Sequence, residues 1–177
     1  HGLGTLSQRA EAPVAQALRD DAARALSSAL RDEEETVRAA AAEALGRCGV
    51  KSYMGAIAEL IDDRTPATTA IAALRALGSL GSPDPSVLVR ASLHQDAEVV
   101  KEAVATAVAI AGPAGSKLLL AAASHARWDV RRAAARAIAA RRDRHVLDDL
   151  RRLAEVEKDA LAGEAMQDAI RILESGA

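Results

Sequence analysis

The side chains that could carry out chemistry are few and widely spaced. His94 and His125 occupy similar positions in two successive segments of the chain, and the sequence gives Cys48 no fixed basic partner. Stacked segments would hold the two histidines roughly 10 Å apart, too far for one metal ion without other ligands. The dipole of a helix favours a histidine at its C-terminal end, so these residues need no catalytic explanation.

Known catalytic patterns are also missing from the sequence. It holds no glycine-rich phosphate loop, no Ser-His-Asp arrangement and no zinc-ligand spacing. The acids at 33–35 and 62–63 lie near expected helix starts, where the helix dipole alone accounts for them. We therefore predict no enzyme, no cofactor and no metal site. We also expect a buried thiol at Cys48, because other copies of its segment hold Leu80 and Ala111 there.

The composition indicates many thin helices in close contact. Of 177 residues, 50% are hydrophobic, yet the chain has one Trp, one Tyr and no Phe. Alanine is abundant, has the highest helix propensity and packs closely. Apolar residues do not alternate with period two, so we predict essentially no strand.

Charge and cysteine content limit the partners and the compartment. The net charge of −2 predicts no bulk attraction to nucleic acid, and one cysteine excludes an internal disulfide. No apolar run reaches membrane-spanning length. Arginine exceeds lysine in an alanine-rich chain, which is typical of a GC-rich genome. We expect a bacterial, cytoplasmic monomer without a membrane segment.

One apolar phrase recurs along the chain with a period of about 31 residues, the signature of a solenoid. Each copy has apolar residues at offsets 0, 3, 4, 7 and 8, which is one face of a helix. The copies are VRAAAAEALGRCG (37–49), TAIAALRALGSLG (69–81), VKEAVATAVAIAG (100–112), VRRAAARAIAARR (130–142) and AGEAMQDAIRILE (162–174).

A second apolar helix is expected before each copy. These helices cover 54–61, 86–93, 117–125 and 145–153, and the stretch 13–32 ends with one of the same kind. The unit is therefore a helix, an acidic turn and a second helix. Because such a hairpin cannot bury both faces alone, neighbouring hairpins must stack. We predict an all-α fold, an α-α superhelix of about five helical hairpins.

The acidic turn followed by V-R-x-A-A-x-A-L-G resembles HEAT-like repeats, especially the short-repeat type found in bilin lyases. Residues 32–38 carry the resemblance best, and it extends over about 22–175. In that family the turn Asp and the helix Arg or Lys form a ladder of hydrogen bonds along the stack. Asp32 with Arg38 matches this pairing, and Asp96 with Lys101 matches it approximately. Thr69-Ala70 replaces Val-Arg in the second copy, where we expect the ladder to be broken.

The repeat suggests one domain over residues 13–177. Its repeats are expected at about 13–49, 52–81, 84–112, 115–142 and 145–175. Residues 1–12 are interpreted as a tag remnant or linker, or as the tail of a preceding repeat. The narrow apolar stripe of the last copy predicts a polar cap, and we expect the chain to be a fragment of a larger protein.

The family resemblance implies that the second helix of each hairpin lines the concave side of the solenoid. Offsets 2, 5 and 6 would face outward there, and they predict a partner-binding surface of Ile71, Leu74, Arg75, Glu102, Arg132 and Arg136. Exposed Ile71 and Leu74 would form a contact patch for a partner helix or peptide. Alternatively, the irregular second repeat, with Pro66 near its helix start, rotates and buries both.

The stretch 127–152 holds nine arginines. One interpretation is a phosphate-contacting patch, as on some DNA glycosylases with a HEAT-like fold. Lysines are few and no aromatic residues interleave to stack bases, which favours a solvated face or an acidic protein partner. Trp128 either packs on Ala133 as the residue before an Asp129 N-cap, or is an exposed anchor for a partner.

Three functional hypotheses follow. The first is a non-enzymatic protein-protein interaction scaffold that binds a helix or extended segment on its concave face, with Trp128 at the edge. The second is a HEAT-like accessory enzyme of the bilin-lyase type, whose catalytic parts lie outside this chain. The third is nucleic-acid binding through the arginines of 127–152.

Overall fold

The structure is a computed structural model that describes residues 21–81 and 83–175. Within these ranges the chain forms helices and turns, and no residue is in a strand. Residues 1–12, interpreted above as a tag remnant, linker or repeat tail, lie outside the described residues.

The helices pair into successive hairpins, and in each pair the second helix is the one that carries the recurring phrase. In the first hairpin, helical residues 21–29 precede α2 (Glu35–Cys48). The other pairs are α3 (Met54–Ala58) with α4 (Ala67–Leu80), α5 (Pro85–Ser92) with α6 (Ala97–Ala107), α7 (Pro113–Ala122) with α8 (Trp128–Arg141), and α9 (Leu147–Val156) with α10 (Ala160–Ser175). Short 3-10 turns, η1 (Lys51–Tyr53) and η2 (Arg144–Val146), lead into α3 and α9.

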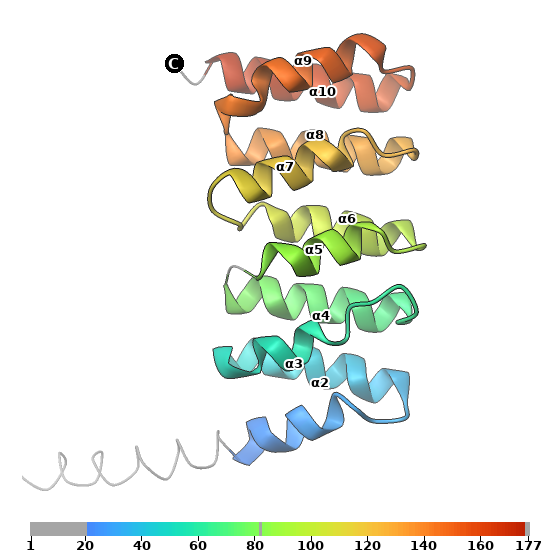
Figure 1. The fold of residues 1–177 in the computed structure, drawn as a ribbon, viewed down its shortest axis with the longest axis vertical. Helices are drawn as coiled ribbons and strands as arrows, with labels where there is room; N and C mark the ends of the chain where they lie inside the picture. The colour runs from blue at the N-terminus through green and yellow to red at the C-terminus, as the bar shows by residue number, and fades with distance from the viewer. Residues whose placement is uncertain (1–20, 82, 176–177) are drawn as a thin grey trace, which may run out of the picture.

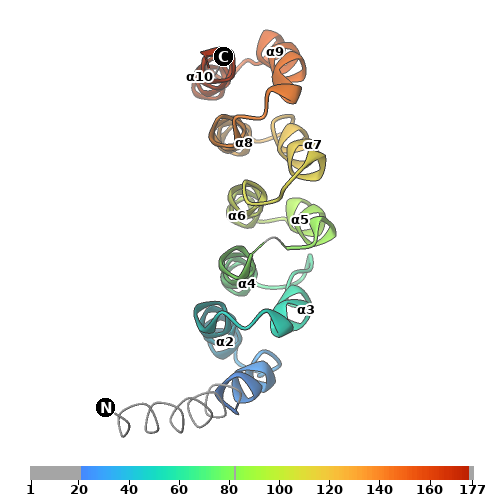
Figure 2. The ribbon, with the colours of Figure 1, turned by 90° about the vertical axis from the view of Figure 1, so that its left-hand side faces the viewer.

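The hairpins stack into a two-layered solenoid (Figure 1). Each second helix packs on the next, so α2, α4, α6, α8 and α10 form one continuous layer. The first helices form the other layer, and the stack bows gently with the second helices on its concave side (Figure 2). The predicted α-α superhelix is confirmed.

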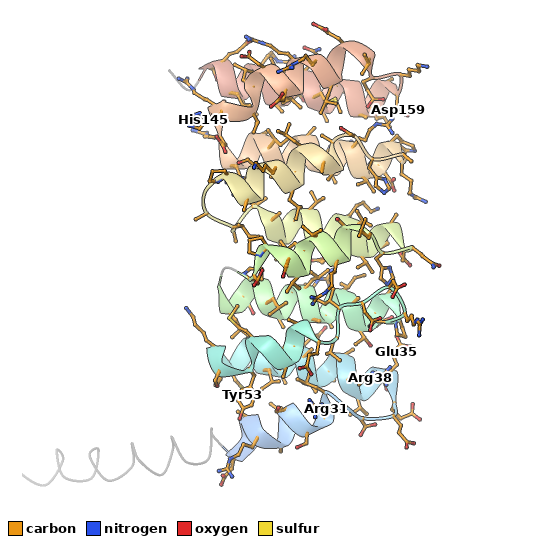
Figure 3. The ribbon with its side chains drawn as sticks, viewed as in Figure 1. Arg31, Glu35, Arg38, Tyr53, His145 and Asp159 are labelled. Carbon is orange, nitrogen blue, oxygen red and sulfur yellow. The ribbon has the colours of Figure 1, made fainter. Side chains whose placement is uncertain are left out.

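The turns within hairpins lie along one edge of the solenoid, and the connections between hairpins lie along the other. Figure 3 shows Glu35, Arg38 and Asp159 on the first edge, and Tyr53 and His145 on the opposite edge. We call the first the turn edge. It places the acidic turns of successive repeats side by side.

Short polar side chains and a glycine mark the helix ends. The carboxylates of Asp84 and Asp96 each accept a hydrogen bond, at 2.8 Å, from the backbone N–H two residues further on. These bonds satisfy donors that the first turn of a helix leaves unpaired. Gly49 ends α2 with φ 71°, a left-handed conformation that glycine adopts without steric cost.

Small residues in the phrase allow neighbouring second helices to approach closely. A Cβ atom on Gly46 of α2 would lie 2.8 Å from the Cα atom of Ala76 in α4 and 2.9 Å from the Ser79 hydroxyl. Such contacts are too short for carbon atoms, so the α2–α4 packing requires glycine at this position. This contact explains why alanine and glycine recur at the repeat interfaces.

Gly46→Ala is expected to lower the free energy of unfolding by about 1–3 kcal/mol, because the added methyl group overpacks the α2–α4 interface. Gly55→Ala is the matched control, since a Cβ on Gly55 of α3 would meet no atom within 4 Å. It should stabilise the protein by about 0.5–1 kcal/mol. Urea unfolding followed by circular dichroism measures both changes. Equal effects would contradict the close approach.

Cations at the start of the later second helices tie one turn to the next. The Lys101 ammonium of α6 lies 2.6 Å from Glu98 on the same helix and 3.4 Å from Asp129 at the start of α8. The Arg131 guanidinium of α8 donates to both carboxylate oxygens of Glu157 in the next turn, at 2.6 and 2.7 Å. The turn edge therefore carries ion pairs between hairpins.

The partners in this ladder differ from those that the resemblance implied. Arg38 donates to the carbonyl oxygens of Asp32 and Glu33, each at 2.8 Å, and not to the Asp32 carboxylate. Asp96 caps its own helix instead of pairing with Lys101. The difference arises because a cation in the first turn of a helix can reach the preceding carbonyls or the next hairpin.

The second repeat lacks a cation in the ladder, as predicted. Ala70 stands at the position of Arg38, and the neighbouring Thr69 hydroxyl donates to the carbonyl oxygen of Glu35 at 3.4 Å. The carboxylate of Asp62 instead accepts hydrogen bonds at 2.8 Å from the backbone N–H groups of Arg64 and Thr65. These bonds lower the pKa of Asp62, the one from Arg64 contributing most.

Candidate partner-binding surface

The concave layer exposes a narrow set of side chains. Arg75, Ala105 and Arg136 are exposed on α4, α6 and α8, and Glu102 and Arg132 are half-buried on the same layer. Six of the seven predicted partner-binding residues therefore lie at least partly in solvent, and only Leu74 is buried. The two apolar residues of α4 behave differently.

Leu74 is fully buried, with an exposed fraction of 0%, so its predicted place on the binding surface is wrong. Ile71 is half-buried and packs against the core. The alternative in which both side chains are buried holds fully for Leu74 and only in part for Ile71. Pro66 is not the cause, because Ala42 and Ala135 at the same offset in α2 and α8 are also buried. The third copy differs, because Ala105 at the same offset in α6 is exposed.

An ion pair crosses the concave face between the second and third hairpins. The Nε atom of Arg75 donates to a carboxylate oxygen of Glu102 at 3.1 Å. The Arg75 side chain remains largely in solvent, and exposed pairs of this kind contribute little to stability. The pair therefore contributes to the charge pattern of the concave surface and little to the stability of the fold.

Trp128, Arg132 and Arg136 form a stripe along α8 (the α8 stripe). Their spacing of four residues places them on one side of the helix. The structure starts α8 at Trp128 with Arg127 as its N-cap, so the predicted Asp129 N-cap is wrong. Trp128 is 41% exposed. Its role as an anchor stays a prediction.

Most arginines of 127–152 form ion pairs or hydrogen bonds within the protein. Arg131 binds Glu157, and Arg127 donates through Nε and one Nη to the two oxygens of Asp129 at 3.0 and 2.9 Å. The exposed pairs on the last hairpin are Arg151 with Asp148 and Glu174, and Arg152 with Asp149. The stretch therefore does not present a continuous basic patch.

Arg141 is a structural residue that the sequence analysis missed. Its guanidinium donates to the carbonyl oxygens of Val108 and Gly112, each at 3.1 Å, and also to that of Ile110. These carbonyls follow α6 and would otherwise lack partners. One sequence feature could have indicated this role. The fourth copy of the phrase has an arginine where the other copies hold Cys48, Leu80 and Ala111.

Cys48 is exposed, which corrects the expectation of a buried thiol. It is the last residue of α2, beyond Leu45 and Gly46, which are the last buried residues of that helix. The helix therefore turns Cys48 away from the interface that buries Leu80 in α4.

The two histidines complete turns. The Nδ1 atom of His94 accepts a hydrogen bond from the Asp96 backbone N–H at 3.0 Å, and its Nε2 atom lies 2.9 Å from the carbonyl oxygen of Thr65 in the preceding repeat. Nδ1 of His125 accepts from the Arg127 N–H at 3.1 Å. Within 21–81 and 83–175, no three His, Cys, Asp or Glu side chains gather as a metal site would require.

The acids of the turn edge are held in their charged form. Hydrogen bonds from Arg127, and secondarily from Lys101, hold the pKa of Asp129 well below its usual range. The Arg131 guanidinium lowers the pKa of Glu157 to about 2, against the opposing effect of burial. On the opposite edge, the Ser116 hydroxyl contributes most to the lowered pKa of Asp143. Asp129 and Glu157 serve as fixed anions that join hairpins.

A family model of HEAT repeats matches residues 23–109. The chain is a HEAT-like repeat protein. The match covers the first three hairpins, and the structure continues the same stacking through α10. The finer resemblance to the short repeats of bilin lyases stays a prediction.

Comparison with solved structures gives the same fold. The crystal structure of an engineered protein, a target of the Northeast Structural Genomics Consortium, aligns with this HEAT-like repeat protein at a TM-score of 0.56 and 21% identity. The alignment covers 87% of this chain and 80% of the engineered one. No curated protein matches. In the described part of the chain, no helix combines the length and apolar character needed to cross a bilayer.

Proposed function

We propose that this chain is a non-enzymatic protein-interaction scaffold that binds a segment of a partner protein on its concave face. The proposal takes residues 13–177 as one repeat domain that acts as a cytoplasmic monomer. A HEAT-like scaffold exposes a continuous layer of second helices, and partner segments bind such surfaces through a few well-placed side chains.

The distribution of reactive groups is the observation that carries this proposal. His94 and His125 complete turns, and Asp129 and Glu157 join hairpins. The charged side chains of the concave layer are in contrast available to solvent at Arg75 and Arg136. Contact with another macromolecule uses side chains of that kind, whereas catalysis needs convergent groups in a closed site.

Site-specific photocrosslinking tests the proposal. We expect a benzoylphenylalanine in place of Ala105, which is exposed on α6, to capture a specific protein in cells of the source organism. The same residue in place of Val89, 51% exposed on α5 of the convex layer, is the matched control and should capture much less. Mass spectrometry identifies the product.

Arg75→Glu provides the second arm of this test. It reverses a charge beside Glu102 on the concave face and should reduce the Ala105 crosslink several-fold. It should change stability by less than about 1 kcal/mol, because the pair is exposed. Equal crosslinking from the Ala105 and Val89 positions would contradict the scaffold proposal.

A further inference from the structure

The α8 stripe combines two residue types that are enriched where proteins bind one another. Trp128 and Arg136 are exposed, and Arg132 between them is half-buried. Because an α-helix rises 1.5 Å per residue, the stripe extends about 12 Å along the axis of α8, and its two arginines are about 6 Å apart along that axis. Trp and Arg are the side chains most often found to dominate binding energy at interfaces.

The two arginines of the stripe are not explained by the stability of the fold. Among residues 21–81 and 83–175, neither Arg132 nor Arg136 forms an ion pair or a side-chain hydrogen bond. The other concave arginine, Arg75, is held by Glu102. Like charges four residues apart on a helix destabilise it by a few tenths of a kcal/mol. The fold therefore gains nothing from this pair of charges.

The surroundings of the stripe suit a protein segment more than a polyanion. A shallow hollow of about 570 Å³ lies beside Trp128, and two carboxylates, of Asp129 and Asp159, lie among its three cations, Arg127, Arg131 and Lys158. These acids would repel the phosphates of a nucleic acid. The hollow can accept one apolar side chain against the indole, while the arginines accept carboxylates.

We propose that the α8 stripe binds an acidic amphipathic helix of a partner protein. Two carboxylates one helical turn apart pair with Arg132 and Arg136, and an apolar side chain one turn beyond them covers Trp128. Arginine suits this role because its planar group binds a carboxylate through two hydrogen bonds. This inference rests on the proposed function and names its class of partner.

The single tryptophan of the chain reports binding at the stripe itself. The probe is a labelled helical peptide with two glutamates four residues apart and a leucine four residues further on. We expect a shift of Trp128 emission and a saturable rise in peptide anisotropy, with affinity that falls as salt rises. The double variant Arg132→Glu/Arg136→Glu should weaken binding at least tenfold.

A matched charge reversal controls for net charge. Arg152 and Arg171, on α9 and α10, have exposed side chains, and each pairs with an acid three residues before it on its own helix. Arg152→Glu/Arg171→Glu changes the net charge equally and should alter peptide affinity less than twofold. A peptide with lysine in place of both glutamates should not bind.

Three results would overturn the inference. They are no saturable binding of the peptide at low salt, equal binding by the Arg132→Glu/Arg136→Glu variant, and displacement of the peptide by a lower concentration of duplex DNA. The failure of the scaffold proposal is a separate result. If the Ala105 crosslink exceeds the Val89 crosslink but the stripe variant binds its captured partner normally, the scaffold stands and the acidic helix is wrong.

Discussion

Glu157→Gln is expected to lower the free energy of unfolding by about 3 kcal/mol, because it removes one partner of a buried ion pair. The Glu157 side chain is 3% exposed and that of Arg131 is 18% exposed. The glutamine amide would place an N–H group against the Arg131 guanidinium, donor against donor. Urea unfolding at pH 7 measures the change.

The effect of Glu157→Gln should depend on pH. The folded-state pKa of Glu157 is lowered from 4.5 to about 2, so the ion pair stabilises the folded state fully above pH 4.5. This contribution disappears as the pH falls through about 2. The stability difference between the wild type and Glu157→Gln should therefore be constant at neutral pH and shrink between about pH 4.5 and 2.

Two controls separate burial from charge. Glu174→Gln removes the partner of Arg151 in an exposed pair and should cost less than about 1 kcal/mol. The double variant Arg131→Met/Glu157→Met removes both buried charges and should be far less destabilising than Glu157→Gln alone. If the double variant lost as much stability as Arg131→Met and Glu157→Met together, each measured alone, the two side chains would not interact.

Leu74→Ala is expected to cost about 2–5 kcal/mol, because it leaves a cavity where α4 packs between its neighbours. Leu74 is among the largest fully buried side chains of the described residues. The matched control, Val89→Ala on the exposed side of α5, should change stability by less than about 0.5 kcal/mol. Thermal and urea unfolding measure both.

The Leu74 result also decides how the concave face can be studied. A Leu74→Glu variant buries a charge and unfolds the second hairpin, so lost binding in that variant says nothing about the surface. Arg75, one residue further on, is the appropriate probe because it is exposed. If Leu74→Ala lowered stability no more than Val89→Ala, Leu74 would lie on the surface. The predicted contact patch of Ile71 and Leu74 would then be correct.

The sequence by itself determined the helices, their pairing and the stacking of the hairpins. Apolar spacing of three and four residues specifies a helix, and a period of about 31 residues specifies a repeated unit that must bury its faces on its neighbours. It also located the gap in the ladder at Ala70, because a methyl group cannot replace a cation. These properties depend on local sequence patterns, which can be recognised without knowledge of the tertiary structure.

Only the tertiary structure decided which side of each second helix faces its neighbour. α4 is apolar almost all round, so its periodicity cannot distinguish Leu74 from an exposed position, and α2 leaves Val37 of the predicted stripe exposed. The contacts of Arg131 with Glu157 and of Arg141 with Ile110 join residues 26 and 31 positions apart. Such contacts depend on the distance between stacked hairpins, which the close approach at Gly46 sets between α2 and α4.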